Sequence, residues 1–268
     1  MKRQHRRTRH NGAYIMLIVC LVAGIAFALS VTRLFNVTNV TVENETDTTS
    51  EQLIEICGFK KGDNLMRMDT RKMAKRIEQE VVYAENVSVS RELPSTLVIH
   101  VEKAVPVANI KSDEKYLLIS ETGRILEITE TPHEGLLIID GYQAKEPALG
   151  TWLQSDDNRQ DNVLKTMMEA VQESEVKADL VDMHDPSEIE VHYGENVLFR
   201  MGSSSDAAYK LKFAAKSIEH INPGKKYRLT MVGHNQISVL PEDDIPHAPA
   251  VQPEQDTESH LNDQIENN

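Results

Sequence analysis

Cysteine is almost absent from this sequence of 268 residues, which contains only Cys20 and Cys57. Cys20 lies inside a long apolar segment, so the two thiols are not expected to form an intramolecular bridge. Without more cysteines, the chain can build neither a disulfide scaffold nor a zinc site made of cysteine ligands. About 200 residues follow the apolar segment, which is enough for one or two packed domains.

Charge is absent from residues 11–32, and the apolar part of this stretch covers residues 13–31. A helix of that length is about 28 Å long, close to the thickness of the hydrocarbon core of a bilayer. The ten residues at the start of the chain carry five bases and no acid, so the positive-inside rule predicts a cytoplasmic N-terminus. We therefore expect a basic cytoplasmic tail over 1–12 and a single membrane helix over 13–34.

A cleaved signal peptide is the alternative for this segment. Residues 26–28 have the Ala-Phe-Ala sequence of a cleavage site. However, the apolar stretch is longer than the roughly 7–15 residues of a signal-peptide core. Apolar residues also continue beyond the cleavage site, at Leu29, Val31 and Leu34. These observations favour an uncleaved anchor.

Acids are absent before residue 36 and abundant after it. The chain has 29 Lys and Arg and 42 Asp and Glu, and six of the bases precede residue 36. The rest of the chain therefore has 23 bases against 42 acids, a net charge of −19. A portion this acidic repels nucleic acid, so nucleic-acid binding is excluded as a function.

Catalytic motifs are missing as well. No G-x-S-x-G elbow surrounds the serines at 203–205, and no glycine-rich loop could hold a phosphate. The acids at 156–161 lack the Gly and Glu of a calcium-binding loop, and His184 has no second histidine at ligand spacing. Helix capping and turn formation explain these residues better. We therefore expect no enzyme activity, no cofactor, no metal site and no small-molecule substrate.

The first external part shows the order strand, helix, helix, strand, strand. Alternating valines predict a strand around 37–42, and a capping box of Thr49 and Gln52 begins a short helix that Gly58 ends. Apolar residues recur every four positions over 69–81, which predicts an amphipathic helix. Two strands are expected at 85–91 and 96–102, joined by a turn at Pro94.

The second external part mixes hairpins with two helices. The hairpins are centred on glycines, and a serine near Ser205 is expected to cap the second helix, which Pro223 and Gly224 end. The expected elements are a hairpin at 115–128, a buried strand at 135–140, a helix at 162–175, a hairpin at 188–202, a helix at 203–222, and strands at 226–232 and 235–241.

Specific motifs in both parts resemble the FtsQ/DivIB family of bacterial cell-division proteins. In the first part they are Gly62-Asp63-Asn64-Leu65, Val87-Ser88-Val89-Ser90-Arg91 and Leu93-Pro94-Ser95-Thr96-Leu97. In the second part they are Tyr193-Gly194, Met201-Gly202 and Tyr209-Lys210-Leu211-Lys212. The resemblance covers about residues 13–241. One departure is the strand at 229–231, which lacks an Asp that family members often carry.

The resemblance implies an α+β fold with a single N-terminal transmembrane helix. A POTRA domain (β-α-α-β-β) is expected over 35–108, followed over 109–241 by an FtsQ/DivIB-type domain with a mostly antiparallel sheet and helices. Residues 242–268 are rich in Pro, Glu, Asp, Gln and Asn, so this acidic tail is expected to be disordered.

The resemblance also implies a function. The chain would be a non-catalytic divisome scaffold in the plasma membrane at the division septum. It would recruit single-pass partners of the FtsL and FtsB/DivIC type and help regulate septal peptidoglycan synthesis. Two alternatives remain: a POTRA-bearing, membrane-anchored secretion or assembly factor, and a membrane-anchored hydrolase.

The last expected strand supplies the candidate partner-binding site. A strand at the edge of a sheet has unpaired backbone groups to which a partner can add a further strand. Alternate side chains such as Ile237 and Val239 would set the fit, although the acidic tail could cover this edge instead. A basic face at Arg71, Lys72, Lys75 and Arg76 is a second possible surface, for which plain solvation is the simpler explanation. The predicted site residues are Gln236, Ile237, Ser238, Val239 and Leu240.

Overall fold

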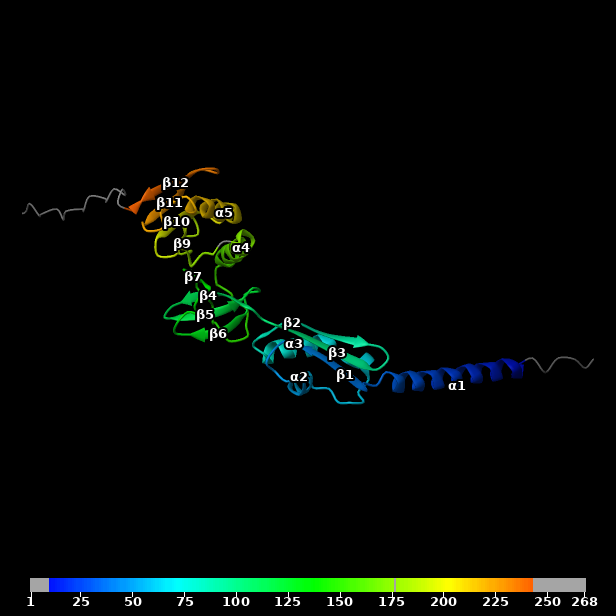
Figure 1. The fold of residues 1–268 in the computed structure, drawn as a ribbon. Coiled ribbons are helices and arrows are strands. Elements are labelled where there is room, and N and C mark those ends of the chain that lie inside the picture. The colour runs from blue at the N-terminus through cyan, green and yellow to red at the C-terminus, as the bar shows by residue number, and fades with distance from the viewer. Residues whose placement is uncertain (1–9, 176, 243–268) are drawn as a thin grey trace, which may run out of the picture.

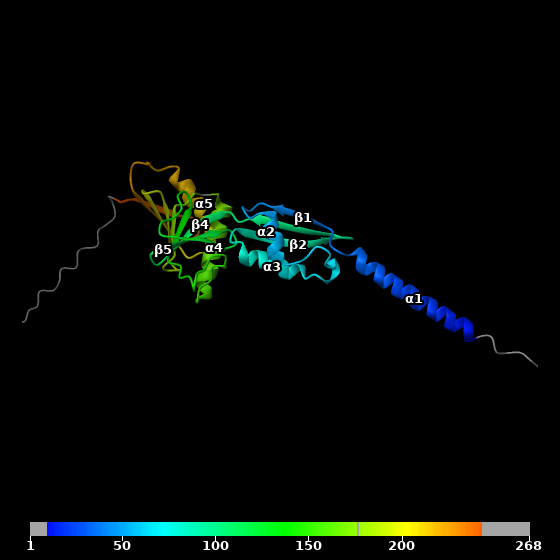
Figure 2. The same cartoon turned by 90° about the horizontal axis from the view of Figure 1, so that it is seen from below.

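Two β-sheets of unequal size, each packed with two α-helices, form the body of the protein in a computed structural model (Figure 1). The structure describes residues 10–175 and 177–242. The predicted basic tail over 1–12 and the predicted disordered tail over 242–268 lie almost entirely outside these described residues. Helix α1 projects from the smaller-sheet end of the molecule, and the larger sheet forms the opposite end (Figures 1 and 2).

Helix α1 runs from His10 to Leu34 and is 25 residues long. All of its described side chains between residues 12 and 25 are exposed, most of them large and apolar. Among the described residues, no helix combines the length and the apolarity needed to cross a bilayer. The side chains of residues 26–33 lie outside the description, so the predicted membrane segment is only partly described.

The smaller sheet has the strand order β1-β3-β2, in which β1 lies parallel to β3 and β2 lies antiparallel to it. Helices α2 and α3 pack on the sheet and close its core. The predicted order β-α-α-β-β is confirmed. The elements are β1 (Asn39–Asn44), α2 (Ser50–Cys57), the 3₁₀ helix η1 (Leu65–Arg67), α3 (Thr70–Glu80), β2 (Ala84–Glu92) and β3 (Thr96–Lys103).

Local sequence signals account for the two helices of this unit. Gln52 N donates to Thr49 Oγ1 (3.3 Å) and Thr49 N donates to Gln52 Oε1 (3.0 Å), which is the predicted capping box. Gly58 adopts a left-handed conformation (φ 69°) and ends α2. Met73 and Ile77, one turn apart on α3, are both buried in the core. The four-residue spacing in the sequence therefore marks the face of α3 that packs on the sheet.

The larger sheet contains nine strands in the order β12-β11-β10-β9-β8-β7-β4-β5-β6 within the described residues. Five neighbouring pairs are antiparallel, and three (β10–β11, β4–β7 and β7–β8) are parallel. The predicted mostly antiparallel sheet is thereby confirmed. The strands are β4 (Pro106–Ser112), β5 (Lys115–Ser120), β6 (Ile125–Thr129), β7 (Leu137–Asp140), β8 (Leu180–Asp182), β9 (Ile189–Tyr193), β10 (Val197–Gly202), β11 (Tyr227–Met231) and β12 (Ile237–Pro241).

Helices α4 (Asn158–Ser174) and α5 (Ala207–Ile218) pack against each other and against the larger sheet. Met167 of α4 and Leu211 of α5 are fully buried in this core. Each helix therefore contributes an apolar face to the core of the larger sheet.

The start of α5 differs from the sequence-based expectation. Asp206, rather than a serine, occupies the N-cap position, and its side chain makes no capping hydrogen bond. Its backbone is left-handed (φ 52°), whereas an N-cap residue normally has an extended backbone that brings its side chain to the first amides of the helix. The hydroxyls of Ser203 and Ser205 lie 2.9 Å apart and bond each other. The predicted serine cap is therefore wrong.

Candidate partner-binding edge

Strand β12 lies at one end of the larger sheet, and β11 is its only neighbour among the described residues. The two strands are antiparallel, with Ile237 opposite Met231 and Pro241 opposite Tyr227. This edge is on the part of the molecule farthest from α1 (Figure 1). The strand that was singled out in the sequence is therefore an edge strand.

The hydrogen bonds at the two ends of this pair show which backbone groups are used. Val232 N donates to Gln236 O (2.8 Å), and Glu242 N donates to Lys226 O (2.9 Å). Hydrogen-bonded and non-hydrogen-bonded pairs alternate along an antiparallel ladder. The hydrogen-bonded positions of β12 are therefore the even-numbered residues.

The odd-numbered residues of β12 direct their backbone groups away from β11. Ile237 and Val239 each present an N–H and a C=O that no described strand pairs, and Pro241 presents only its C=O. Ser238 and Leu240 use their backbone groups in the ladder with β11. The edge thus offers two donors and three acceptors to an added strand.

The burial of the side chains of β12 differs from what the sequence suggested. Ile237 and Val239 are half-buried and pack against the core of the larger sheet, so they also support the fold. Leu240 is 42% exposed. Gln236 precedes the strand and lies in the turn that follows β11. A substitution that tests this edge must therefore separate backbone pairing from packing.

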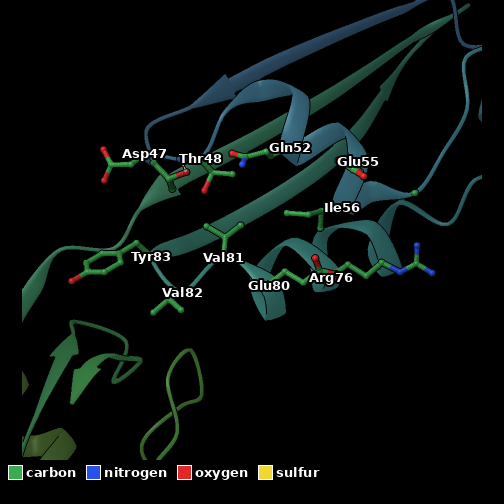
Figure 3. Close-up of a pocket in the computed structure, with 12 residues that line it drawn as sticks. Asp47, Thr48, Gln52, Glu55, Ile56, Arg76, Glu80, Val81, Val82 and Tyr83 are labelled. Atoms are coloured by element: carbon green, nitrogen blue, oxygen red, sulfur yellow. Dashed lines mark hydrogen bonds between the residues drawn. The ribbon is translucent and has the colours of Figure 1, made fainter. Parts of the chain in front are cut away.

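A groove of ≈720 Å³ lies on the smaller unit between the loop after β1, α2 and the end of α3 (Figure 3). Three of its lining residues, Asp47, Glu55 and Glu80, are acidic. Arg76 Nη1 donates to Cys57 O (3.3 Å) and so joins α3 to α2. Burial raises the pKa of the Cys57 thiol to about 11, so the thiol stays protonated and is a poor nucleophile. The groove itself is lined by both polar and apolar side chains, the latter including Ile56, Val81 and Val82.

The predicted basic face of α3 is an exposed surface in the structure. Arg71, Lys72 and Lys75 are exposed, and Lys72 Nζ lies 4.0 Å from Asp69 Oδ2. Arg76 is directed toward α2, as described above. The bases therefore do not act as one group.

The residues that might have suggested catalysis have structural partners. Asp157 caps α4 by accepting from Arg159 N (2.9 Å), and Asp161 accepts from the hydroxyl of Tyr142 (2.6 Å). His184 Nδ1 lies 2.7 Å from Asp182 Oδ1 within one turn. Within the described residues, no group of three His, Cys, Asp or Glu side chains is placed to hold a metal ion.

Arg124 is a key residue that the sequence did not reveal. It is 1% exposed and lies in the turn between β5 and β6. Its Nε donates to Val82 O (2.8 Å), and its Nη2 donates to Val81 O (3.1 Å) and to Glu78 O. The guanidinium also lies 5.2 Å from the centre of the Trp152 ring. Arg124 thereby joins the larger sheet to the end of α3.

Two further side-chain contacts support this junction between the units. The hydroxyl of Ser120 donates to Glu85 Oε1 (2.8 Å), and the hydroxyl of Tyr83 donates to Glu127 Oε1 (2.5 Å). The turn between β5 and β6 thus docks onto the corner where α3 leads into β2. Because several acceptors are backbone carbonyls, no sequence motif could have predicted the junction.

Comparisons with known proteins match this architecture. Residues 35–103 match the family described as POTRA domain, FtsQ-type. The cell division protein DivIB of Clostridium acetobutylicum is 27% identical over 201 residues, which cover 75% of this chain and 79% of the relative. The cell division protein FtsQ of Corynebacterium glutamicum is 29% identical over 125 residues, covering 47% and 55%. DivIB of Clostridium botulinum (strain Hall) is 21% identical over 217 residues, covering 80% and 84%.

The fold and these matches define a POTRA-bearing protein in which a larger sheet follows the POTRA unit. The matched relatives are all named as cell division proteins, so they give no support to a secretion or assembly factor. The chain thus contains an FtsQ-type POTRA match and is similar to cell division proteins named DivIB and FtsQ.

Proposed function

We propose that this chain is a membrane-anchored, non-catalytic scaffold that recruits other division proteins by strand addition at β12. The observation that carries the proposal is the outer edge of β12 at the end of the larger sheet, which no described strand pairs. An extended partner segment would form the next strand by pairing with the outward backbone groups of Ile237 and Val239.

The partners are proposed from the family. Single-pass proteins of the FtsL and FtsB/DivIC type would supply the added strand and so join the division complex. Through them the chain would help regulate septal peptidoglycan synthesis. The POTRA domain would act between the anchor and the larger domain, which carries the binding edge.

Helix α1 is the proposed anchor, with the chain in the plasma membrane at the division septum. Its described side chains between residues 12 and 25 are exposed and mostly apolar, which suits contact with lipid. The five bases in the first ten residues favour a cytoplasmic N-terminus, so both sheets would lie on the extracytoplasmic side.

The substitution Val239→Pro tests strand addition directly. Proline removes the outward N–H of residue 239 and leaves the ladder with β11 intact, because that N–H is not used there. Val239→Ala is the matched control, since it removes more of the side chain but keeps the N–H. We expect Val239→Pro to weaken partner binding about tenfold, because the partner carbonyl is left unpaired, and Val239→Ala to weaken it much less. Affinity for the partner's extracytoplasmic segment is the measurement.

Septation provides the second measurement for the same pair of variants. Cells that depend on Val239→Pro should form filaments without septa, whereas cells with Val239→Ala should divide. Removing residues 243–268 in a third variant would raise the affinity if the acidic tail covers the edge. A folded Val239→Pro protein with unchanged affinity would contradict the proposed site.

A further inference from the structure

The segment that follows α1 is bonded directly to the loop over residues 60–67. Leu65 N donates to Phe35 O (2.7 Å), and Val37 N donates to Asp63 O (2.9 Å). Phe35 is the first residue after α1. The loop is therefore held within a few residues of the end of that helix.

The turn between β2 and β3 is held at the same place. Thr38 N donates to Ser95 O (3.0 Å), and the Thr38 hydroxyl donates to the Ser95 hydroxyl (2.9 Å). Arg91 joins the turn to the loop, because its Nε donates to Leu65 O (2.9 Å) and its Nη2 to Met68 O (2.5 Å). Figure 2 shows the end of the β2–β3 hairpin beside the C-terminal end of α1. We call residues 60–67 and 92–95 the anchor-side tip.

The anchor-side tip carries exposed apolar side chains that the fold does not require. Met66 is 56% exposed and Leu93 is 59% exposed. Among the described residues from 35 to 103, these are the only large apolar side chains that are exposed to this extent. Their neighbours Leu65 and Met68 are buried, so the core is complete without Met66. Both exposed residues lie at the end of the POTRA unit that adjoins α1.

The anchor-side tip is also locally basic in an acidic protein. Lys60, Lys61 and Arg67 are all exposed. The acids of the tip are Asp63 and Glu92, and Asp63 Oδ2 already accepts from Lys60 N (2.9 Å). The tip therefore has one net positive charge, whereas the chain beyond residue 35 has a net charge of −19.

We propose that the anchor-side tip rests on an anionic phospholipid surface. Met66 and Leu93 would enter the region of the headgroups, while Lys60, Lys61 and Arg67 would pair with lipid phosphates. This combination of apolar and basic side chains is typical of segments that lie at a membrane interface. The inference rests on the proposed anchoring by α1, which brings the tip to the membrane.

Contact at two points would orient the protein. A helix alone lets the attached domain swing, whereas a helix with the tip beside it fixes the direction in which the POTRA unit leaves the membrane. The junction at Arg124 would carry that direction on to the larger sheet. The edge at β12 would then be presented at a fixed height above the bilayer.

The single tryptophan of the chain makes a direct test possible. In a Trp152→Phe background, Met66→Trp places the only tryptophan at the tip. Val232→Trp in the same background is the control, because Val232 is also exposed but lies beside β12. Each full-length variant is reconstituted in vesicles of phosphatidylcholine with about one third phosphatidylglycerol. We expect a blue-shifted emission and about twofold stronger quenching by brominated lipid for Met66→Trp than for Val232→Trp.

Charge reversal tests the role of the bases. Lys60→Glu, Lys61→Glu and Arg67→Glu are combined in the Met66→Trp protein. Arg71→Glu, Lys72→Glu and Lys75→Glu are the matched control, since they make the same change of charge on the exposed face of α3. Only the first set should reduce quenching by brominated lipid to the level of Val232→Trp. Equal effects of the two sets would overturn the assignment of phosphate contacts to the tip.

The outcomes separate this inference from the proposed anchoring. A chain that stays in the vesicles through an alkaline wash, with Met66→Trp as accessible to aqueous acrylamide as Val232→Trp, overturns the inference and leaves the anchoring in place. A chain that the wash removes from the vesicles overturns both. Protection of Met66→Trp from acrylamide in a retained chain supports both.

Discussion

At the scale of single residues, Arg124 supplies hydrogen-bond donors to the C-terminal end of α3. The last carbonyls of α3 lack partners within the helix, and a helix end buried without partners is costly. Arg124 supplies a cation and several N–H donors to the carbonyls of Glu78, Val81 and Val82. Burial lowers its pKa, while the nearby carboxylates of Glu78 and Glu85 oppose that shift. The residue therefore acts as a charged cap delivered from the other unit.

Replacing this cap should cost stability. We expect Arg124→Met to lower the free energy of unfolding by about 3 kcal/mol, because buried carbonyls lose a charged donor. Arg124→Lys should recover only part of the loss, since an ammonium cannot reproduce the planar set of donors. Arg200→Met is the control: its pair with Glu190 (2.8 Å) is half-exposed, so the expected cost is within about 1 kcal/mol. Urea unfolding of the three variants is the measurement, and equal costs for Arg124→Met and Arg200→Met would contradict the role.

At the scale of elements, the outer strand of the POTRA sheet is held partly by one histidine. His100 of β3 has Nδ1 3.2 Å from Glu43 Oε2 of β1 and Nε2 3.3 Å from Glu102 Oε1. Both ring nitrogens face carboxylates, so both can donate only when the ring is protonated. The hydrogen bonds to Glu102 and then to Glu43 raise the pKa of His100. Protonation therefore strengthens the contact between β1 and β3.

The sign of the pH dependence follows from this shift. Because the folded pKa of His100 lies above its unfolded value of about 6.5, its contribution is fully present below that value. The contribution is lost as the pH rises through the folded pKa. The stability difference between the wild type and His100→Gln should therefore be larger at about pH 6 than at about pH 9. Urea midpoints measured across this range check the prediction, and a difference that grows with pH would refute it.

The elements that could be predicted from the sequence are those with local signals. The capping box at Thr49, the four-residue spacing of Met73 and Ile77, and the glycine-centred hairpins all placed their elements correctly. The serine cap of α5 failed because it depends on the backbone conformation of Asp206, which sequence patterns do not encode. The parallel neighbours β4, β7 and β8 lie far apart in the sequence, so no local signal could place them side by side.

The candidate site, too, could be predicted only in part from the sequence. The position of β12 at the end of the chain's last strand pair suggested an edge, and the structure places it there. Which residues direct their backbone groups outward depends on the register with β11, which the sequence does not specify. The packing of Ile237 and Val239 on the core likewise depends on the neighbouring strands and α5.

At the scale of the whole molecule, the junction determines whether the POTRA unit and the larger sheet move as one rigid body. Strand β3 ends at Lys103 and β4 begins at Pro106, so the covalent link is short. Ala104 N donates to Tyr83 O (2.9 Å), and Ala104 packs with Leu118 and Leu126 in a small shared core. With Arg124 added, the link has apolar, charged and hydrogen-bonded parts. We therefore expect the POTRA unit and the larger sheet to move as one body.

Distances between spin labels can test this rigidity. The labels replace exposed residues Ser88 on β2 and Thr166 on α4, in a Cys20→Ala background. Cys57 stays unlabelled, because it is buried and burial raises its pKa to about 11. We expect one narrow distance distribution for this protein.

The double variant Tyr83→Phe and Glu85→Ala should widen that distribution about twofold, because domains joined by small polar interfaces move when those contacts are lost. Tyr142→Phe is the control, since it removes a hydroxyl bond to Asp161 inside the larger unit and leaves the junction intact. It should leave the distribution narrow. A wild-type distribution already as broad as that of the double variant would show that the junction does not hold the units together, and the tip could not then set the height of β12.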